Sequence, residues 1–444
     1  MPLVPAAILA MLFLALAIWR REAALAAFCG LLPVYLVRLS LPLGIGTLPS
    51  TLLEVFFWEL FVAWYFMDAP DAKKPGAWDA LEEWAVPLTI FVTAATISVF
   101  VSSDLRAALG LWRAYILEPI LFFPMFVHTV KREKHGIWMI ATLGTCISVI
   151  GVTAIYQKIT GFGIPNPAWA AAATRRATSF FGFPNAIALL SAPVVTLMAG
   201  WSLALLRAKR STRRLLAILP AAAALLGTCG VVFAVSKGGM IGIAVGITAL
   251  GLFDKKLRAW TLGAIIAACM VVMLYLPATN FFARIVGFRE DSSSVRGIIW
   301  SETANMFKDN PVFGAGLSGY PTRIAPYHTH YWIEIFQYPH DILVNFWSET
   351  GMLGLGAFIW IIVRFFRKSW KLHKNGWIVA TNAAVMITLL IHGLVDVPYF
   401  KNDLAFLFWI IVGITESVQA ASRASLLDKA KAVVTGEPIS PWVT

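Results

Sequence analysis

Hydrophobic residues occur along most of the chain in continuous runs that are long enough to cross a lipid bilayer. A transmembrane α-helix needs about 20 mainly apolar residues, and runs of that kind recur as far as residue 420. They lie near 3-19, 23-39, 50-67, 86-101, 107-128, 137-157, 185-206, 215-235, 238-253, 259-276, 343-363, 377-395 and 403-420. The pattern predicts an all-α integral membrane protein with about 12-13 transmembrane helices.

The polar segments between these runs are short, with one exception. Residues 277-342 form a long connection in which Pro, Gly, Asn, Tyr and His are mixed with stretches compatible with a helix, such as Ser294 to Lys308. Long ordered loops usually carry function. We find no internal repeat and no second soluble domain, so residues 1-444 are expected to form a single membrane domain. Within it, loop 277-342 is expected to be extracytoplasmic and to carry part of the active site.

The composition excludes two other classes of protein. Of the 444 residues, 59% are hydrophobic and only 14% are charged, whereas soluble domains carry roughly 25% charged residues. The mean hydropathy of +0.74 therefore excludes a soluble multidomain enzyme. Outer-membrane barrels show alternating segments of about 10 residues. The continuous apolar runs exclude that class as well.

The formal net charge of +12 comes from short basic clusters between the apolar runs. Such clusters fix the orientation of membrane helices, because cytoplasmic loops carry an excess of Lys and Arg. We therefore expect no nucleic acid partner. The clusters assigned to the cytoplasm are Arg20/Arg21, Lys73/Lys74, Lys131/Arg132/Lys134, Arg207 to Arg214, Lys255 to Arg258 and Arg364 to Lys374.

Strict alternation of the helices then assigns the remaining connections to the outer side. These are residues 40-49, 102-106, 158-184, 236-237, 277-342 and 396-402. The outer side still holds many cations, against the usual bias, and anionic partners would explain them, because Arg binds phosphate oxygens through two parallel hydrogen bonds. The outer cations are Arg175, Arg176, Lys237, Arg284, Arg289, Arg296, Lys308 and Arg323.

Ionisable residues inside transmembrane spans are costly, so each is a candidate for function or for packing. We interpret Arg38, Glu54, Arg113 and Glu118 as ion pairs that fix helix packing. The remaining candidates in or at the mouths of spans are Glu59, Lys237, Asp341, Glu349 and His392.

The densest polar pattern lies at the entry to the span that begins near residue 343. The segment reads YPHDILVNFWSETGMLGLGAF (338-358), and Asp341, Asn345 and Glu349 recur every four residues. That spacing predicts one polar stripe on an otherwise apolar helix, which must face protein or water. His340 stands at the mouth of the span, where an imidazole suits general base catalysis. A structural role for this histidine remains an alternative.

Several catalytic motifs do not occur in the sequence. There is no DxD pair, no GxxxxGK[ST] loop, no HExxH and no GxSxG. Their absence disfavours nucleotide-driven transport and zinc or serine hydrolysis. The sequence instead favours a metal-free transfer from an already activated lipid, with no cofactor.

The sequence resembles the O-antigen ligase and polymerase superfamily, which are polytopic bacterial membrane enzymes. The resemblance covers roughly residues 150 to 410. It rests on RRATSFFGFPNAIALL (175-190), SKGGM (236-240), VRGIIWSETANMFKDNPVFGAGLSGYP (295-321) and the 338-358 segment. These look like the family's loop-to-span entry, its Ser-Arg-Gly, its Arg-x-x-x-Trp with a Pro-x-x-Gly-x-Gly turn, and its His, Glu, Gly, Gly-Leu signature.

The resemblance implies roles for particular residues. The family's essential base maps onto His340, and its two essential outer cations map onto Lys237 and Arg296. Lys237 stands where the family usually has Arg, which keeps the charge but loses the bidentate geometry. Asp341 follows His340 where Asn is common. The other residues expected to bind substrate are Arg176, Arg289, Asp341 and Glu349.

The implied activity is that of a membrane glycosyltransferase. It would move a glycan from undecaprenyl diphosphate to a hydroxyl group of a lipid or glycan acceptor. The reaction would need no metal and would invert the anomeric carbon, and membrane lipid would surround the protein. The location implied is the bacterial inner membrane, with the active site on the periplasmic face. A polymerase of the same superfamily is one alternative. A secondary transporter or lipid flippase, using Glu59 and Glu118, is an alternative from another class.

Overall fold

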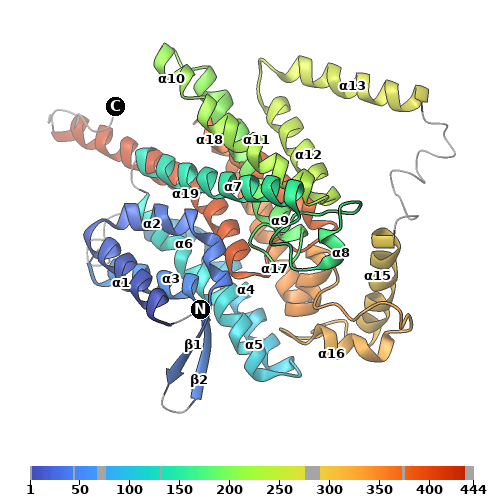
Figure 1. Ribbon diagram of the computed structural model, residues 1–444. Helices are drawn as coiled ribbons and strands as arrows, with labels where there is room; N and C mark the ends of the chain where they lie inside the picture. The colour runs from blue at the N-terminus through green and yellow to red at the C-terminus, as the bar shows by residue number, and fades with distance from the viewer. Residues whose placement is uncertain are drawn as a thin grey trace.

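The computed structural model describes residues 3–43, 46–67, 77–130, 133–275, 291–372 and 376–435, and these form a bundle of α-helices (Figure 1). The prediction of an all-α integral membrane protein is confirmed. The elements of the first half are α1 (Leu3–Trp19), α2 (Arg21–Gly30), η1 (Leu32–Leu36), β1 (Arg38–Leu43), β2 (Gly46–Thr51), α3 (Leu52–Met67), α4 (Ala77–Val101), α5 (Leu105–Leu111), the π-helix η3 (Trp112–Leu117), α6 (Glu118–Thr129), α7 (Glu133–Thr160), α8 (Pro167–Ala170) and α9 (Asn185–Leu206).

The second half begins at α10 and ends with α19, whose membrane span is largely buried. Its elements are α10 (Ser211–Leu215), α11 (Ile218–Phe233), α12 (Lys237–Phe253), α13 (Arg258–Tyr275), α15 (Asp291–Asp309), α16 (Tyr320–Ile324), η4 (Ala325–Tyr327), α17 (Ile342–Leu372), α18 (Trp377–Gly393) and α19 (Asn402–Thr435). The predicted helical stretch Ser294 to Lys308 lies within α15. Helices α15 and α16 lie to one side of the bundle, beside α17 (Figure 1).

Seven helical segments of the described residues are long and apolar enough to cross a membrane by length and composition. They are Glu82–Val101, Leu105–Thr129, His135–Thr160, Asn185–Leu206, Ser211–Phe233, Ile342–Leu372 and Asn402–Ala420. Four shorter apolar helices accompany them at Val4–Trp19, Lys237–Phe253, Arg258–Met270 and Trp377–Gly393. The total of about 12-13 spans stays a prediction.

The N-terminal region differs from the prediction in two places. The apolar run 23-39 is not one span, because α2 ends at Gly30 and a short 3-10 helix with Pro33 in its first turn follows. Residues 40–43 and 46–49 are not a simple loop either. They belong to an antiparallel hairpin in which Arg38 pairs with Thr51 and Leu43 with Gly46, and the hairpin projects from the bundle (Figure 1). Leu39, Leu41 and Leu43 alternate with other residues, which is the period of a strand.

Of the four residues expected to form ion pairs, Arg113, Glu54 and Glu118 do so in the described structure, and no ion pair of Arg38 is found there. Nη2 of Arg113 lies 2.8 Å from Oε2 of Glu54, and its Nε lies 3.4 Å from Oε1 of Glu118. Asn402 also donates to Glu54 over 2.7 Å, and Trp58 donates to Glu118 over 2.9 Å. Buried charges need such partners. The cluster joins α3, η3, α6 and α19.

Helix α12 packs closely on α18 through a face of small residues. Gly238, Gly242 and Gly246 recur every four positions along one side of α12. A Cβ at Gly238 would lie 2.9 Å from Cδ2 of His392, and one at Gly242 would lie 2.9 Å from the carbonyl oxygen of Thr388. Small residues let helix backbones approach in this way. The contact brings the start of α12 against the end of α18.

Candidate active site

His340 lies at the junction between the long loop and α17. Its backbone φ of 56° is in the left-handed region, which is rare for a residue other than glycine and often marks a functional position. The imidazole lies between two aromatic rings, with centroids 5.0 Å from Phe336 and 4.8 Å from Tyr338. Its Nδ1 lies 3.7 Å from Oδ1 of Asp396, and 17% of the side chain stays exposed. His340 is thus both held in place and accessible.

Asp396 is the carboxylate that faces His340, and the sequence analysis did not single it out. It follows the end of α18 and is only 2% exposed. Its Oδ2 accepts a hydrogen bond from Nδ2 of Asn185 at 3.2 Å, and its Oδ1 accepts from the backbone amide of Val397 at 2.9 Å. Burial alone would raise the pKa of Asp396. The imidazoles of His340 and His392 outweigh this effect and lower the pKa to about 2. The side chain is therefore an anion at neutral pH.

A carboxylate in this position selects the state of the imidazole. An anion facing Nδ1 favours a proton on that nitrogen and leaves Nε2 as the basic atom. The same arrangement stabilises the imidazolium once Nε2 has taken a proton. The pair therefore has the chemistry of a general base with an orienting partner.

Arg176 joins the same site from the connection between α8 and α9. Its Nη2 donates to Oδ1 of Asn185 at 3.1 Å, and its Nε donates to the carbonyl of Ala234 at 3.0 Å. Asn185 in turn donates to Asp396, so one amide side chain links Arg176 to the carboxylate. Burial and the nearby charge of Arg296 both lower the pKa of Arg176. The charge of one predicted cation therefore acts on another.

Arg296 enters the site from α15. Its charge opposes the effects of burial, Asp396 and Tyr115, which together raise the pKa of Tyr338. One turn further along α15, Trp300 donates from Nε1 to the carbonyl of Pro339 at 2.8 Å. That hydrogen bond fixes α15 to the residue directly before His340. The Arg-x-x-x-Trp pattern therefore contributes a cation and an anchor for the histidine.

Two lysines lie at the edges of this cluster. Lys237 is exposed and is the first residue of α12, next to Gly238, which packs on His392. Lys401, which the sequence analysis did not single out, has its ammonium 4.0 Å from the ring centroid of Phe183. Burial lowers the pKa of Lys401, while Asp403 and Asp396 oppose the shift.

Asp341 and Glu349 have contacts of a different kind. Oδ1 of Asp341 accepts hydrogen bonds from the backbone amides of Leu343 at 2.8 Å and Val344 at 2.9 Å, which is the geometry of a helix N-cap. Burial raises the pKa of Asp341, although these two hydrogen bonds oppose the shift. Glu349 is buried and accepts from the backbone amide of Ser318 at 2.7 Å. The carboxylate that faces His340 is Asp396, and these two acids shape the backbone around it.

The Pro-x-x-Gly-x-Gly turn lies against a break in α17. At Gly351 the helix adopts a φ of 70°, and a Cβ there would lie 2.5 Å from the carbonyl oxygen of Val312. The amide of Met352 donates to that same carbonyl at 2.9 Å, and Ala315 donates to the carbonyl of Ser348 at 2.8 Å. Only glycine tolerates both the conformation and the close approach. The turn and the Glu-x-Gly segment thus form one interlocked unit.

Glu302 of α15 holds the loop segment that leads to His340. Its carboxylate lies 3.0 Å from Nδ1 of His328 and 2.9 Å from Nδ1 of His330, and it accepts from the amide of Thr329 at 2.9 Å. Burial opposes ionisation of Glu302, but these hydrogen bonds lower its pKa to about 2. No pattern in the sequence indicates this contact.

Arg289, which was expected to bind substrate, lies outside the described residues. Of the other expected residues, His340 faces Asp396, and Arg176 is linked to Asp396 through Asn185. The charge of Arg296 acts on Arg176 and Tyr338, and Lys237 begins the helix that packs on His392. Within the described part of the chain, no group of three or more His, Cys, Asp or Glu side chains is arranged to hold a metal ion.

These features define the chain as a polytopic α-helical membrane protein with a histidine, a buried carboxylate and several cations at the ends of its helices. Residues 221–359 match the family model described as O-Antigen ligase. This match supports the superfamily that the sequence resembles. His340, Arg296 and Lys237 lie inside the matched region, and Arg176 and Asp396 lie outside it. A comparison with curated protein sequences gives no match.

Proposed function

We propose that the protein is a glycosyltransferase of the O-antigen ligase type. It transfers a glycan from undecaprenyl diphosphate to a hydroxyl acceptor on the periplasmic face of the bacterial inner membrane. The observation that carries this proposal is the pairing of His340 with the buried Asp396 beside Arg176 and Arg296. The O-antigen ligase domain supports the choice of a lipid-linked glycan as donor.

His340 acts as the general base in the proposed reaction. Nε2 removes the proton of the acceptor hydroxyl while that oxygen attacks the anomeric carbon. A new bond forms between the anomeric carbon and the acceptor oxygen, and the bond to the diphosphate oxygen breaks. The electron pair leaves with the lipid diphosphate. Attack from the side opposite the leaving group inverts the configuration at the anomeric carbon, and Asp396 stabilises the imidazolium that forms.

The cations stabilise the charge that develops on the leaving diphosphate. The hydrogen bonds of Arg176 to Asn185 and Ala234 go to neutral acceptors, so its charge remains available for an anion. Arg296 and Lys237 add charge from α15 and α12. Fixed cations aimed at a leaving group act without reorganisation during the reaction. We propose that they do so without a metal ion.

The test is a reconstituted reaction. Purified protein in lipid vesicles is given a glycan on undecaprenyl diphosphate and a separate hydroxyl acceptor, with and without a chelator. We expect transfer in both conditions, with an inverted linkage in the product. Extension of the donor glycan itself would identify a polymerase. Movement of intact lipid-linked glycan across the vesicle membrane, with no new glycosidic bond, would contradict the proposal and favour a flippase.

A further inference from the structure

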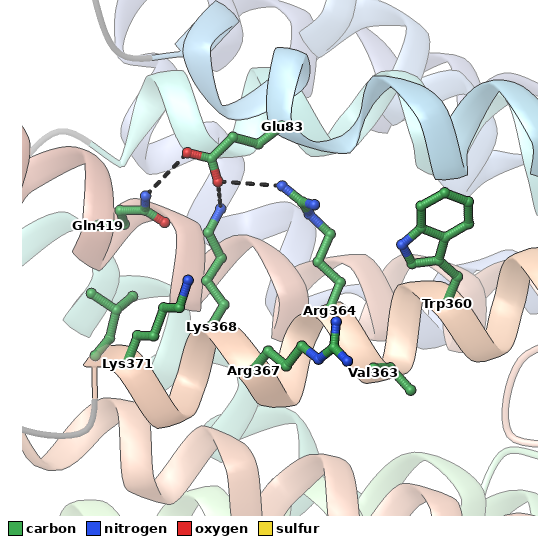
Figure 2. A pocket seen from close by; sticks show the side chains of 9 residues that line it. Glu83, Trp360, Val363, Arg364, Arg367, Lys368, Lys371 and Gln419 are labelled. Atoms are coloured by element: carbon green, nitrogen blue, oxygen red, sulfur yellow. Dashed lines mark hydrogen bonds and ion pairs between the residues drawn. The ribbon is translucent and has the colours of Figure 1, made fainter.

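A second polar site lies at the opposite end of α17 from His340. A pocket of about 500 Å³ opens between the last turns of α17, the start of α4 and the middle of α19 (Figure 2). That volume is typical of ligand-binding pockets. The lining residues are Glu83, Trp360, Val363, Arg364, Arg367, Lys368, Lys371, Leu372 and Gln419.

Two of the lining cations are held by carboxylates. Nζ of Lys368 lies 2.6 Å from Oε2 of Glu83 and 2.6 Å from Oε2 of Glu416. Nη2 of Arg364 lies 3.5 Å from Oε2 of Glu83. Both cations also lie near the indole ring of Trp84, at 5.7 Å and 5.4 Å from its centroid. These contacts join α4, α17 and α19 and form a fixed wall of the pocket.

The other two cations are in a different state. Arg367 and Lys371 are exposed, and they stand four positions apart on α17, which is the spacing of neighbours on one helix face. No carboxylate of the described residues forms an ion pair with either side chain. The pocket therefore carries four cations beside Glu83 and Glu416, and among the described residues no carboxylate balances the charges of Arg367 and Lys371.

The apolar neighbours of the pocket indicate the kind of anion that fits it. On the same helix, Ile359, Trp360 and Val363 are exposed by 44%, 44% and 41%, directly before the run of cations. Tryptophan is enriched where a membrane helix meets the headgroup layer. An apolar face followed by cations along one helix matches the order of chemistry in a phospholipid, with acyl chains first and phosphate next.

We propose that this pocket binds the phosphate headgroup of an anionic phospholipid. Arg367 and Lys371 hold the phosphate, the Glu83–Lys368–Glu416 cluster forms the wall behind it, and the acyl chains lie along Ile359 and Val363. Basic pockets between transmembrane helices are suited to such lipids. The cluster Arg364 to Lys374, interpreted from sequence as a topology signal, thus has a second use.

The test is lipid binding to the full-length protein in neutral detergent, measured by native mass spectrometry as a titration. We expect phosphatidylglycerol to bind more tightly than phosphatidylcholine. The double variant Arg367→Gln/Lys371→Gln should bind phosphatidylglycerol at least about tenfold more weakly, because hydrogen bonds to charged groups contribute at least that much. The charge-preserving variant Arg367→Lys should retain most of the binding.

The matched control is Lys255→Gln/Lys256→Gln, which removes two exposed cations from another basic cluster. It should bind phosphatidylglycerol like the wild-type protein. Equal binding by all variants, or equal binding of phosphatidylcholine, would overturn the proposal. Displacement of the lipid by millimolar inorganic phosphate would show a site for free phosphate instead, and would also overturn it. If the double variant does not fold, single Lys371→Gln gives the same comparison.

Discussion

The two ends of helix α17 both carry clusters of charged side chains, but the clusters are built differently. At the Arg364 to Lys371 end, carboxylates from α4 and α19 lie 2.6 Å from the ammonium of Lys368. At the His340 end, the buried carboxylate of Asp396 faces an imidazole and an amide, and Arg176 donates to neutral oxygens. One end neutralises part of its charge within the protein. At the other end, the guanidinium of Arg176 is held by neutral groups.

The difference shows how one residue type serves two purposes. Arginine paired with a carboxylate stabilises helix packing, whereas arginine bonded to neutral groups keeps its position and most of its electrostatic effect. The backbone differs as well, since φ is left-handed at His340, whereas α17 is regular helix around Arg364 and Lys368. Strain of this kind persists only where the surroundings enforce it. Substitutions at the His340 end should therefore lower turnover far more than substitutions at the Arg364 end.

The largest effect is expected for His340→Ala. Removing the base should lower turnover by about 100-fold to 10,000-fold, the usual range for general acid–base catalysis. Thermal stability should change little, because the imidazole is partly exposed at the start of α17 and Ala has to adopt the same left-handed backbone conformation. The measurement is turnover of the purified variant at saturating donor. Retention of more than about a tenth of wild-type turnover would make His340 a structural residue.

The next effect concerns the cations. Arg296→Gln should lower turnover by about 100-fold to 1,000-fold, as expected for one preorganised group that stabilises developing charge. Lys237→Gln should also lower turnover, whereas Lys237→Arg, which restores the residue usual in the family, should keep it. Arg364→Gln, at the other end of α17, is the matched control and should leave turnover close to wild type. A turnover near wild type in both Gln variants of the site would remove the cations from the mechanism.

A smaller loss is expected for Asp396→Asn. An amide keeps the shape but loses the charge. We expect a loss of about 10-fold to 100-fold, the range known for carboxylates that orient metal-bound histidines. Asp341→Asn is the comparison, because an Asn still caps a helix, and it should cost less than Asp396→Asn. Turnover of the two variants at one pH shows whether Asp396 or Asp341 orients His340. The opposite order would assign the orienting role to Asp341.

The smallest of these effects should come from Trp300→Phe. The change removes the hydrogen bond from Nε1 to Pro339, which contributes about 0.5–1.5 kcal/mol, so turnover should fall by no more than about tenfold. Because α15 carries Arg296 as well, the variant should shift both His340 and the cation. Hydrogen exchange of the loop amides around residue 340 should rise. Unchanged exchange would show that other contacts hold this loop.

Much of the fold follows from hydropathy, and much of the site does not. Apolar length predicts helices, and alternation of direction assigns His340, Arg176 and Lys237 to one end. The same alternation brings the end of α18 beside the start of α17. Asp396 was missed because it follows a span and was counted as an ordinary loop residue. An acid at the end of a span next to the one that begins with His340 is the signal that would have identified it.

Other features depend on contacts that no local pattern reveals. The role of Asp341 as a helix cap follows from its hydrogen bonds to Leu343 and Val344, and sequence alone does not distinguish it from a carboxylate that binds substrate. The hairpin of β1 and β2 was missed because its alternating leucines lie within a short connection between two apolar runs. Long-range partners such as Asn185 and Asp396, 211 residues apart, become visible only in three dimensions.

The central claim is that His340 and Asp396 act as one catalytic unit, and a double-mutant cycle tests it most directly. Turnover is measured for His340→Ala, Asp396→Asn and the double variant at saturating donor. If Asp396 acts through the imidazole, its substitution should have almost no further effect once His340 is absent, so the double variant should match His340→Ala. Losses that multiply across the two substitutions would show that the residues act independently, and would contradict the account.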